Sequence, residues 1–170
     1  MLHHHHRLPR NTTTTSSSLL PYTTSPPPLP PPQVVNGFNS TVFAYGQTSS
    51  GKTHTMKGTG DDPGIIPLAV REIFQLIGAC QDREFLLRVS YMELYNEDIN
   101  DLLAPDNQKL AVHETKEAGV HVAGLREDIV SSPEQVLELL ECGERHRHTG
   151  ETRMNKSSSR SHTVFRMVVE

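Results

Sequence analysis

The segment that most constrains the fold of this chain is Gly46–Thr53, with the sequence GQTSSGKT. It directly follows Thr41–Tyr45, TVFAY, whose β-branched and aromatic residues favour an extended strand. Glycines at its first and sixth positions permit backbone angles that a side chain would forbid, so the chain can turn sharply and begin a helix. The sequence therefore predicts a strand, a glycine-rich loop and a helix in succession.

The octapeptide fits the pattern G-x-x-x-x-G-K-[ST] of phosphate-binding loops, in which backbone N–H groups surround the α- and β-phosphates. In that pattern the lysine reaches the β- and γ-phosphates and the final hydroxyl binds Mg²⁺, positions that Lys52 and Thr53 occupy here. The alternative is a plain glycine-rich turn. The candidate nucleotide-binding residues are Gly46, Gln47, Thr48, Ser49, Ser50, Gly51, Lys52 and Thr53.

Composition limits the class of protein. With 170 residues the chain has room for one domain, and a net charge of −4 gives no overall basic field to attract nucleic acid or anionic lipid. Cys80 and Cys142 are too few for a disulfide framework and lack metal-ligand spacing. There is no apolar run long enough for a membrane helix and no signal peptide. We therefore expect a cytoplasmic protein that binds neither nucleic acid nor membrane.

The chain divides into two compositionally different parts. Residues 1–33 are rich in histidine, threonine, serine and proline, and we expect a disordered arm. Its segment Pro26–Pro32 favours polyproline II, either as a spacer or as a ligand for an SH3- or WW-type partner. From residue 34 to residue 170 strand and helix signals alternate, which predicts an α/β fold with helices covering a sheet.

Four further elements are predicted within residues 34–125. An apolar stripe with helical spacing indicates a helix packed on the sheet; it comprises Ile66, Ala69, Val70, Ile73, Phe74 and Ile77. The run Phe85–Tyr91 predicts a strand continuing to about Tyr95. Asn96 would then cap a short helix over Glu97–Leu103. Residues Lys109–His113 and Val120–Leu125 predict a hairpin turning at Glu117–Gly119.

The C-terminal part begins with a strong helix signal. Ser132 precedes Pro133 at the first helical position, and Gln135 lies three residues after the serine, as in a capping box. Val136, Leu139, Leu140 and Gly143 should share the buried face of this helix, and Thr163–Val169 predicts a strand. Between them lies Asn155–His162, NKSSSRSH. Its hydroxyls and guanidinium suit a loop that faces phosphate and water, or a solvated connection.

The pair GQTSSGKT and NKSSSRSH resembles the nucleotide loop and first switch of the kinesin motor domain, whose switch pattern is N-x-x-S-S-R-S-H. Further segments agree in the family's order: Phe43–Gly46, Gly64–Pro67, Tyr95–Glu97 and Asp101–Leu103. The resemblance covers residues 34–170. In the sequences of the segments Arg83–Tyr91 and Gly150–Asn155, the chain is most similar to the kinesins that resemble centromere protein E.

This resemblance implies an ATP-driven microtubule motor with a P-loop fold, a mixed sheet flanked by helices. It implies that Gly46–Thr53 binds ATP, that Thr53 and Ser159 approach Mg²⁺, and that Ser158 lies near the attacking water. It also implies that Arg160 latches to a second switch. Asn155, Ser158, Ser159 and Arg160 are thus the candidate catalytic residues.

The implied partner is the microtubule, which part of the 109–125 hairpin would face. The implied location is the cytoplasmic cytoskeleton, and the full-length protein would be a homodimer through a coiled coil.

The resemblance also predicts a motor domain incomplete at both ends. The family's opening strand and its R-x-R-P segment should precede Val34, where the proline-rich arm stands. The second switch and the main microtubule-binding helix are expected beyond Glu170. Two alternatives stay open: a different P-loop ATPase, or a fragment that binds nucleotide or a partner without turnover. A GTPase is disfavoured, because Asn155–Lys156 does not continue as the guanine-specific N-K-x-D tetrapeptide.

Overall fold

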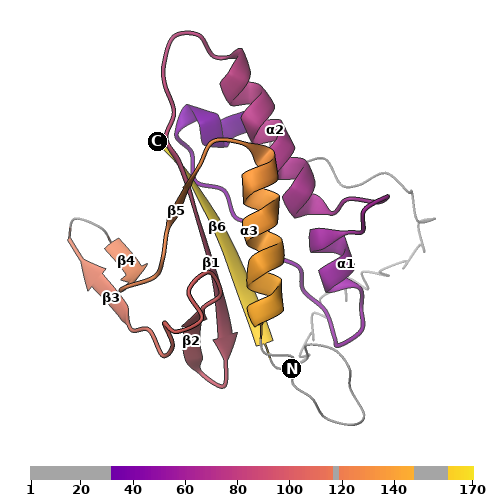
Figure 1. Cartoon of the computed structure of the whole chain (residues 1–170), viewed down its shortest axis with the longest axis vertical. Helices are drawn as coiled ribbons and strands as arrows, with labels where there is room; N and C mark the ends of the chain where they lie inside the picture. Colours follow the sequence, from indigo (N-terminus) through magenta and orange to yellow (C-terminus); the bar gives the residue numbers. More distant parts are fainter. Residues whose placement is uncertain (1–31, 117–118, 148–160) are drawn as a thin grey trace, which may run out of the picture.

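The structure is a computed structural model that describes residues 32–116, 119–147 and 161–170. Its centre is strand β1, Leu87–Tyr95, in a four-stranded sheet (Figure 1). One edge of β1 pairs along its whole length with β6, Ser161–Val169; the other edge pairs with β2, Asp98–Asp101, and β5, Asp128–Val130. All these pairings are antiparallel. The predicted strands at 85–95 and 163–169 are confirmed.

Two helices cover one face of this sheet. Helix α2 spans Ile65–Ala79 and α3 spans Pro133–His146, as the apolar stripe and the capping signal predicted. The Ser132 hydroxyl accepts the N–H of Gln135, while the Gln135 side chain accepts the N–H of Ser131, so the serine cap forms as expected. The core between helices and sheet contains buried Val70, Leu87, Val89, Val130 and Val136. The predicted α/β fold is therefore confirmed.

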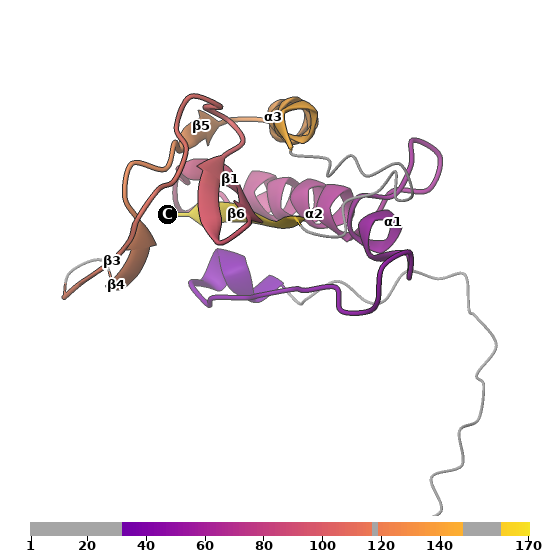
Figure 2. The ribbon, with the colours of Figure 1, turned by 90° about the horizontal axis from the view of Figure 1, so that it is seen from below.

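The remaining helices are short. The 3-10 helix η1 spans Pro32–Asn36, and α1 spans Lys52–Lys57. Figure 2 shows η1 and α3 on opposite sides of β1 and β6. Within the described residues no helix is long and apolar enough to cross a bilayer.

Two predicted elements are wrong. Residues 97–103 do not form a helix: Asn96 and Glu97 have φ angles of 50° and 70°, which make a two-residue turn between β1 and β2. Residues 98–101 instead form backbone hydrogen bonds with the edge of β1, which a short isolated helix could not provide. Residues 41–45 are likewise not a strand, because no described strand pairs with them, and Phe43 and Tyr45 are 80% and 94% exposed.

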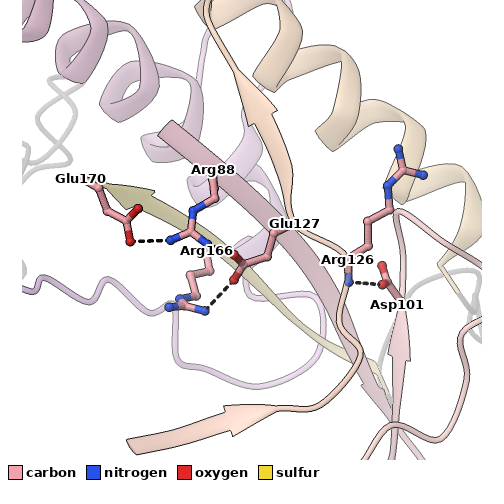
Figure 3. Close-up of polar contacts among 6 residues, drawn as sticks. All are labelled: Arg88, Asp101, Arg126, Glu127, Arg166 and Glu170. Atoms are coloured by element: carbon pink, nitrogen blue, oxygen red, sulfur yellow. Dashed lines mark hydrogen bonds and ion pairs between the residues drawn. The ribbon is translucent and has the colours of Figure 1, made fainter. Parts of the chain in front are cut away.

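The predicted hairpin is present with shorter arms. Strands β3, Val112–Thr115, and β4, Gly119–Val122, pair in a separate sheet with His113 opposite His121. Buried Asp101 fixes the base of this excursion, since one carboxylate oxygen accepts the N–H of Leu103 and the other accepts that of Arg126 at 2.7 Å (Figure 3). One side chain thus joins the two ends of the segment that carries the hairpin.

The face of the sheet away from the helices is charged. Arg88 and Arg166 both contact Glu127, at 2.7 and 3.1 Å, and Arg88 also contacts Glu170 (Figure 3). They alternate along their strands with the core residues Val89 and Met167, and so point to the opposite face. These ion pairs join β1 and β6 to Glu127, which immediately precedes β5.

We predict that Gly143→Ala destabilises the fold. A Cβ at this buried position of α3 would lie 2.4 Å from Cδ1 of Tyr91. Overpacking of this kind costs about 1–3 kcal/mol, which exceeds the gain of about 1 kcal/mol from replacing a helical glycine by alanine. Urea denaturation of both proteins would measure the difference.

The control is Gly78→Ala on α2, where the added Cβ meets nothing within 4 Å. There only the helix propensity acts, so the free energy of unfolding should rise by about 0.5–1 kcal/mol. If Gly143→Ala raised the free energy of unfolding as Gly78→Ala is expected to do, the close approach of α3 to Tyr91 would be refuted.

Candidate functional site

The candidate site is the loop Gly46–Thr53 at the start of α1. The loop contains a turn in which the N–H of Ser50 donates to the carbonyl of Gln47 at 3.2 Å. Gly51 occupies the N-cap position with a φ of 90°, a left-handed conformation that favours glycine. The first N–H groups of a helix have no intrahelical acceptors, and no side chain caps this end of α1. The N–H groups at the start of α1 are therefore candidate donors to an anion.

Lys52 closes the loop from the inside. Its ammonium donates to the carbonyl oxygens of Gly46 and Gln47, both at 2.8 Å. These two contacts use two of the three donors of an ammonium group. The loop has room for glycine at position 46 but not for a larger residue, because a Cβ there would lie 2.6 Å from the Ser50 hydroxyl oxygen. The lysine is thus held against the first two carbonyl groups of the loop, beside the uncapped start of α1.

Of the predicted site residues, all eight of the loop lie together in the described structure. Asn155, Ser158, Ser159 and Arg160 lie outside the described residues, so their placement is not tested. The last two residues of the NKSSSRSH segment are described: Ser161 and His162 begin β6, and Ser161 is buried.

The structure also shows a polar network that sequence reasoning missed. Glu144, in the last turn of α3, accepts the Tyr91 hydroxyl and lies 2.9 Å from the ammonium of Lys57 at the end of α1. Arg147 follows at i+3, 3.7 Å from the same carboxylate, and donates to the hydroxyl and carbonyl of Ser161, each at 3.1 Å. Only the Glu144–Arg147 spacing was visible in the sequence; the other partners lie on distant segments.

Burial and charge set the ionisation of this network. Burial raises the pKa of the Tyr91 hydroxyl, and the neighbouring Glu144 carboxylate raises it further, so the tyrosine stays a donor. Burial also opposes ionisation of Glu144. Hydrogen bonds from Tyr91 and Lys57, with the positive charges of Lys57 and Arg147, outweigh it and lower the pKa of Glu144. Glu144 is therefore a half-buried carboxylate held in its charged form.

A glycine-rich loop leading into a helix beside a helix-covered sheet defines the P-loop class of α/β proteins. Comparison with known proteins specifies the family, because residues 28–170 match the kinesin motor domain. Kinesin-like protein KIN-7I of Oryza sativa subsp. japonica is 67% identical over 136 residues, and Kinesin-like protein KIN-7O of Arabidopsis thaliana 66%. Kinesin-related protein 11 of Dictyostelium discoideum is 55% identical over 139 residues. Each alignment covers 80% of this chain.

Solved structures agree with these relatives. A structure described as a fast kinesin superposes with a TM-score of 0.74 and 48% identity, covering 81% of this chain and 40% of that one. A KIF14 dimer with AMP-PNP in complex with a microtubule gives a TM-score of 0.68 and 41% identity, over 75% and 37% of the two chains. The chain belongs to the kinesin motor-domain family, as its motifs predicted. It spans 11% of each of the two plant relatives and 20% of the Dictyostelium protein.

The lowered pKa of Glu144 predicts an acid-sensitive contribution to stability. Because the folded-state pKa lies below the ordinary value of 4.5, ionised Glu144 stabilises the fold above that pH, and the contribution is lost as pH falls through the folded-state pKa. The difference in unfolding free energy between the wild type and Glu144→Gln should therefore shrink as the pH falls below 4.5 and through the lowered folded-state pKa. Urea denaturation across this range measures it, and a difference independent of pH would contradict the charge assignment.

Proposed function

We propose that this chain is part of an ATP-binding microtubule motor that couples ATP hydrolysis to movement along the microtubule. The observation that carries the proposal is the loop Gly46–Thr53, with Lys52 held against its first two carbonyl groups, in a chain of the kinesin motor-domain family. We propose residues 34–170 as the motor-domain segment and residues 1–33 as a separate disordered arm. The proposed location is the cytoplasm, on microtubules.

The proposed cofactors are ATP and Mg²⁺, and the loop suits them chemically. Its amides and the Lys52 ammonium are donors for phosphate oxygens, and a charged acceptor would compete well with the neutral carbonyls that Lys52 now contacts. Thr53 is exposed at the start of α1, where its hydroxyl is accessible to a metal. When bound, Mg²⁺ would neutralise charge on the phosphates.

Roles for the first-switch residues come from the family resemblance. Ser159 would share the metal with Thr53, Ser158 would orient the attacking water, and Arg160 would hold the switch closed, with Asn155 in the same segment. Such groups accelerate phosphoryl transfer by positioning and by electrostatic stabilisation, with little covalent chemistry by the protein.

The proposed partner is the microtubule, contacted in part by the hairpin β3–β4. This hairpin extends away from the helices (Figure 1), and its Val112 and Val120 are 57% and 71% exposed. The related KIF14 structure is of a microtubule complex. We also propose that the whole protein is a homodimer. Similarity to the centromere-protein-E-like class stays a prediction, since the plant relatives named above carry KIN-7 designations.

A second candidate is a segment that binds nucleotide without efficient turnover. It is favoured by the exposure of Phe43 and Tyr45 directly before the loop, where no described strand supports residues 41–45. A loop whose preceding segment is not held in a sheet has less rigid support for positioning reacting groups.

Replacing Lys52 by alanine should remove most nucleotide affinity. Truncating one partner of a charge-assisted contact costs on the order of 2–5 kcal/mol, here for an ammonium facing phosphate. A titration with fluorescent ATP would measure the loss. The matched control is Lys116→Ala, which removes one exposed positive charge from the hairpin. Equal binding by wild type and Lys52→Ala would overturn the phosphate-loop assignment.

Residues 1–170 alone should hydrolyse ATP much more slowly than a longer motor segment, with little stimulation by microtubules. The family resemblance places the second switch and the main track-binding helix beyond residue 170, and positioning effects of this kind are each worth orders of magnitude in rate. Phosphate release with and without polymerised tubulin tests this, with a longer version of the chain for comparison. Strong stimulation of residues 1–170 would contradict the prediction but not the family membership.

A further inference from the structure

Helix α1 depends on outside contacts for its position. It has six residues, none of them buried, and its last residue is tied to the start of α2, where the Gly64 N–H donates to the Lys57 carbonyl at 3.1 Å. At the C-terminal end of α1, the Lys57 ammonium also lies 2.9 Å from Glu144, with side-chain exposures of 32% and 18%. Partial burial limits screening by solvent and salt, so this pair holds α1 against α3 more firmly than a surface pair would.

Glu144 is itself fixed from two other directions. The Tyr91 hydroxyl on β1 donates to its second oxygen, and the guanidinium of Arg147 lies 3.7 Å from the oxygen that faces Lys57. Tyr91 is 2% exposed and packs edge-on against Phe165 of β6, with ring centroids 6.0 Å apart. The carboxylate therefore has a defined position relative to the central strands.

Arg147 continues the network to β6. It immediately precedes segment 148–160, and its side chain, 11% exposed, donates to both the hydroxyl and the carbonyl of Ser161, which immediately follows that segment. The Ser161 hydroxyl in turn donates to Glu93, which is fully buried on β1. One guanidinium thus joins the two residues that flank segment 148–160.

We propose that Glu144 is a positioning residue that couples the phosphate-loop helix to the two residues flanking segment 148–160. This inference rests on the proposed function, because the coupling matters only if Gly46–Thr53 binds nucleotide. The Glu144 carboxylate contacts Lys57 of α1 and Arg147, which in turn contacts Ser161. Removing the charge of Glu144 would therefore weaken both ion pairs at once.

The expected consequence is a change in nucleotide preference. A diphosphate is bound by the loop itself, whose geometry is local and includes the Lys52 contacts with Gly46 and Gln47. Under the proposed function, the γ-phosphate would also be contacted by the first-switch residues that the family resemblance implies. Glu144→Gln keeps the shape of the side chain and a hydrogen-bond acceptor for Tyr91 but removes the charge. It should lower the preference for triphosphate over diphosphate by about fivefold or more, the lower range of measured coupling between sites.

The test is displacement of a fluorescent nucleotide from residues 1–170 by a non-hydrolysable ATP analogue and by ADP, each with Mg²⁺. For Glu144→Gln we expect weaker binding of the analogue and nearly unchanged binding of ADP. The matched control is Glu141→Gln, the same chemical change on the same helix, where the carboxylate is 78% exposed and contacts Arg145 at 3.9 Å. It should leave both affinities unchanged. A merely structural role for Glu144 would weaken both nucleotides equally.

A double-mutant cycle gives a second measurement if Glu144→Gln does not fold. Lys57→Met and Ser161→Ala alter opposite ends of the network, and both act through Glu144 and Arg147, so their effects on triphosphate preference should be less than additive. Unchanged preference in Glu144→Gln, or additive effects in the cycle, would overturn the coupling while leaving the proposed function intact. Failure of the wild-type chain to bind nucleotide would overturn both.

Discussion

Strand β1 carries polar side chains that are buried by its central position in the sheet, and these side chains need hydrogen-bond partners from other elements. It pairs along both edges, and it carries the Tyr91 hydroxyl and the fully buried Glu93 carboxylate inward. A buried polar group without a partner costs free energy comparable to a lost hydrogen bond, so each must be met by another element. Tyr91 is met by Glu144 from α3, and Glu93 by Ser161 from β6. Both partners belong to the elements that flank segment 148–160.

The close approach of α3 to β1 makes this network possible. Gly143 has no side chain between the helix and the Tyr91 ring, so Glu144, the next residue along α3, reaches the tyrosine hydroxyl. The same carboxylate then faces Lys57 of α1. A helix that buries none of its residues is thereby attached to the rigid centre of the sheet. The candidate loop Gly46–Thr53 lies at the other end of α1, which is also bonded to the start of α2 through the Gly64 N–H and the Lys57 carbonyl.

On the other side of the sheet, charged contacts fix the excursion that carries the β3–β4 hairpin. Asp101 joins the two ends of this excursion, and Glu127 joins Arg88 of β1 to Arg166 of β6 (Figure 3). The candidate nucleotide loop and the proposed microtubule-facing hairpin are therefore both linked to β1 through polar contacts, although they lie on separate segments. The same sheet therefore supports both candidate sites.

The sequence by itself determined the features whose signals are local. The start of a helix after the glycine-rich loop, the stripe of α2 and the serine cap of α3 are patterns within a few residues, and each was predicted correctly together with the kinesin motor-domain family. Phosphate binding by the loop stays a prediction. Only the tertiary structure decided which strands pair and which charges meet. Residues 98–101 became a strand because β1 offered them an edge, and residues 41–45 did not because no described strand does. Lys57, Tyr91 and Glu144 meet across 87 residues of sequence, and no local pattern encodes such a contact, because burial and chain topology alone bring these groups together.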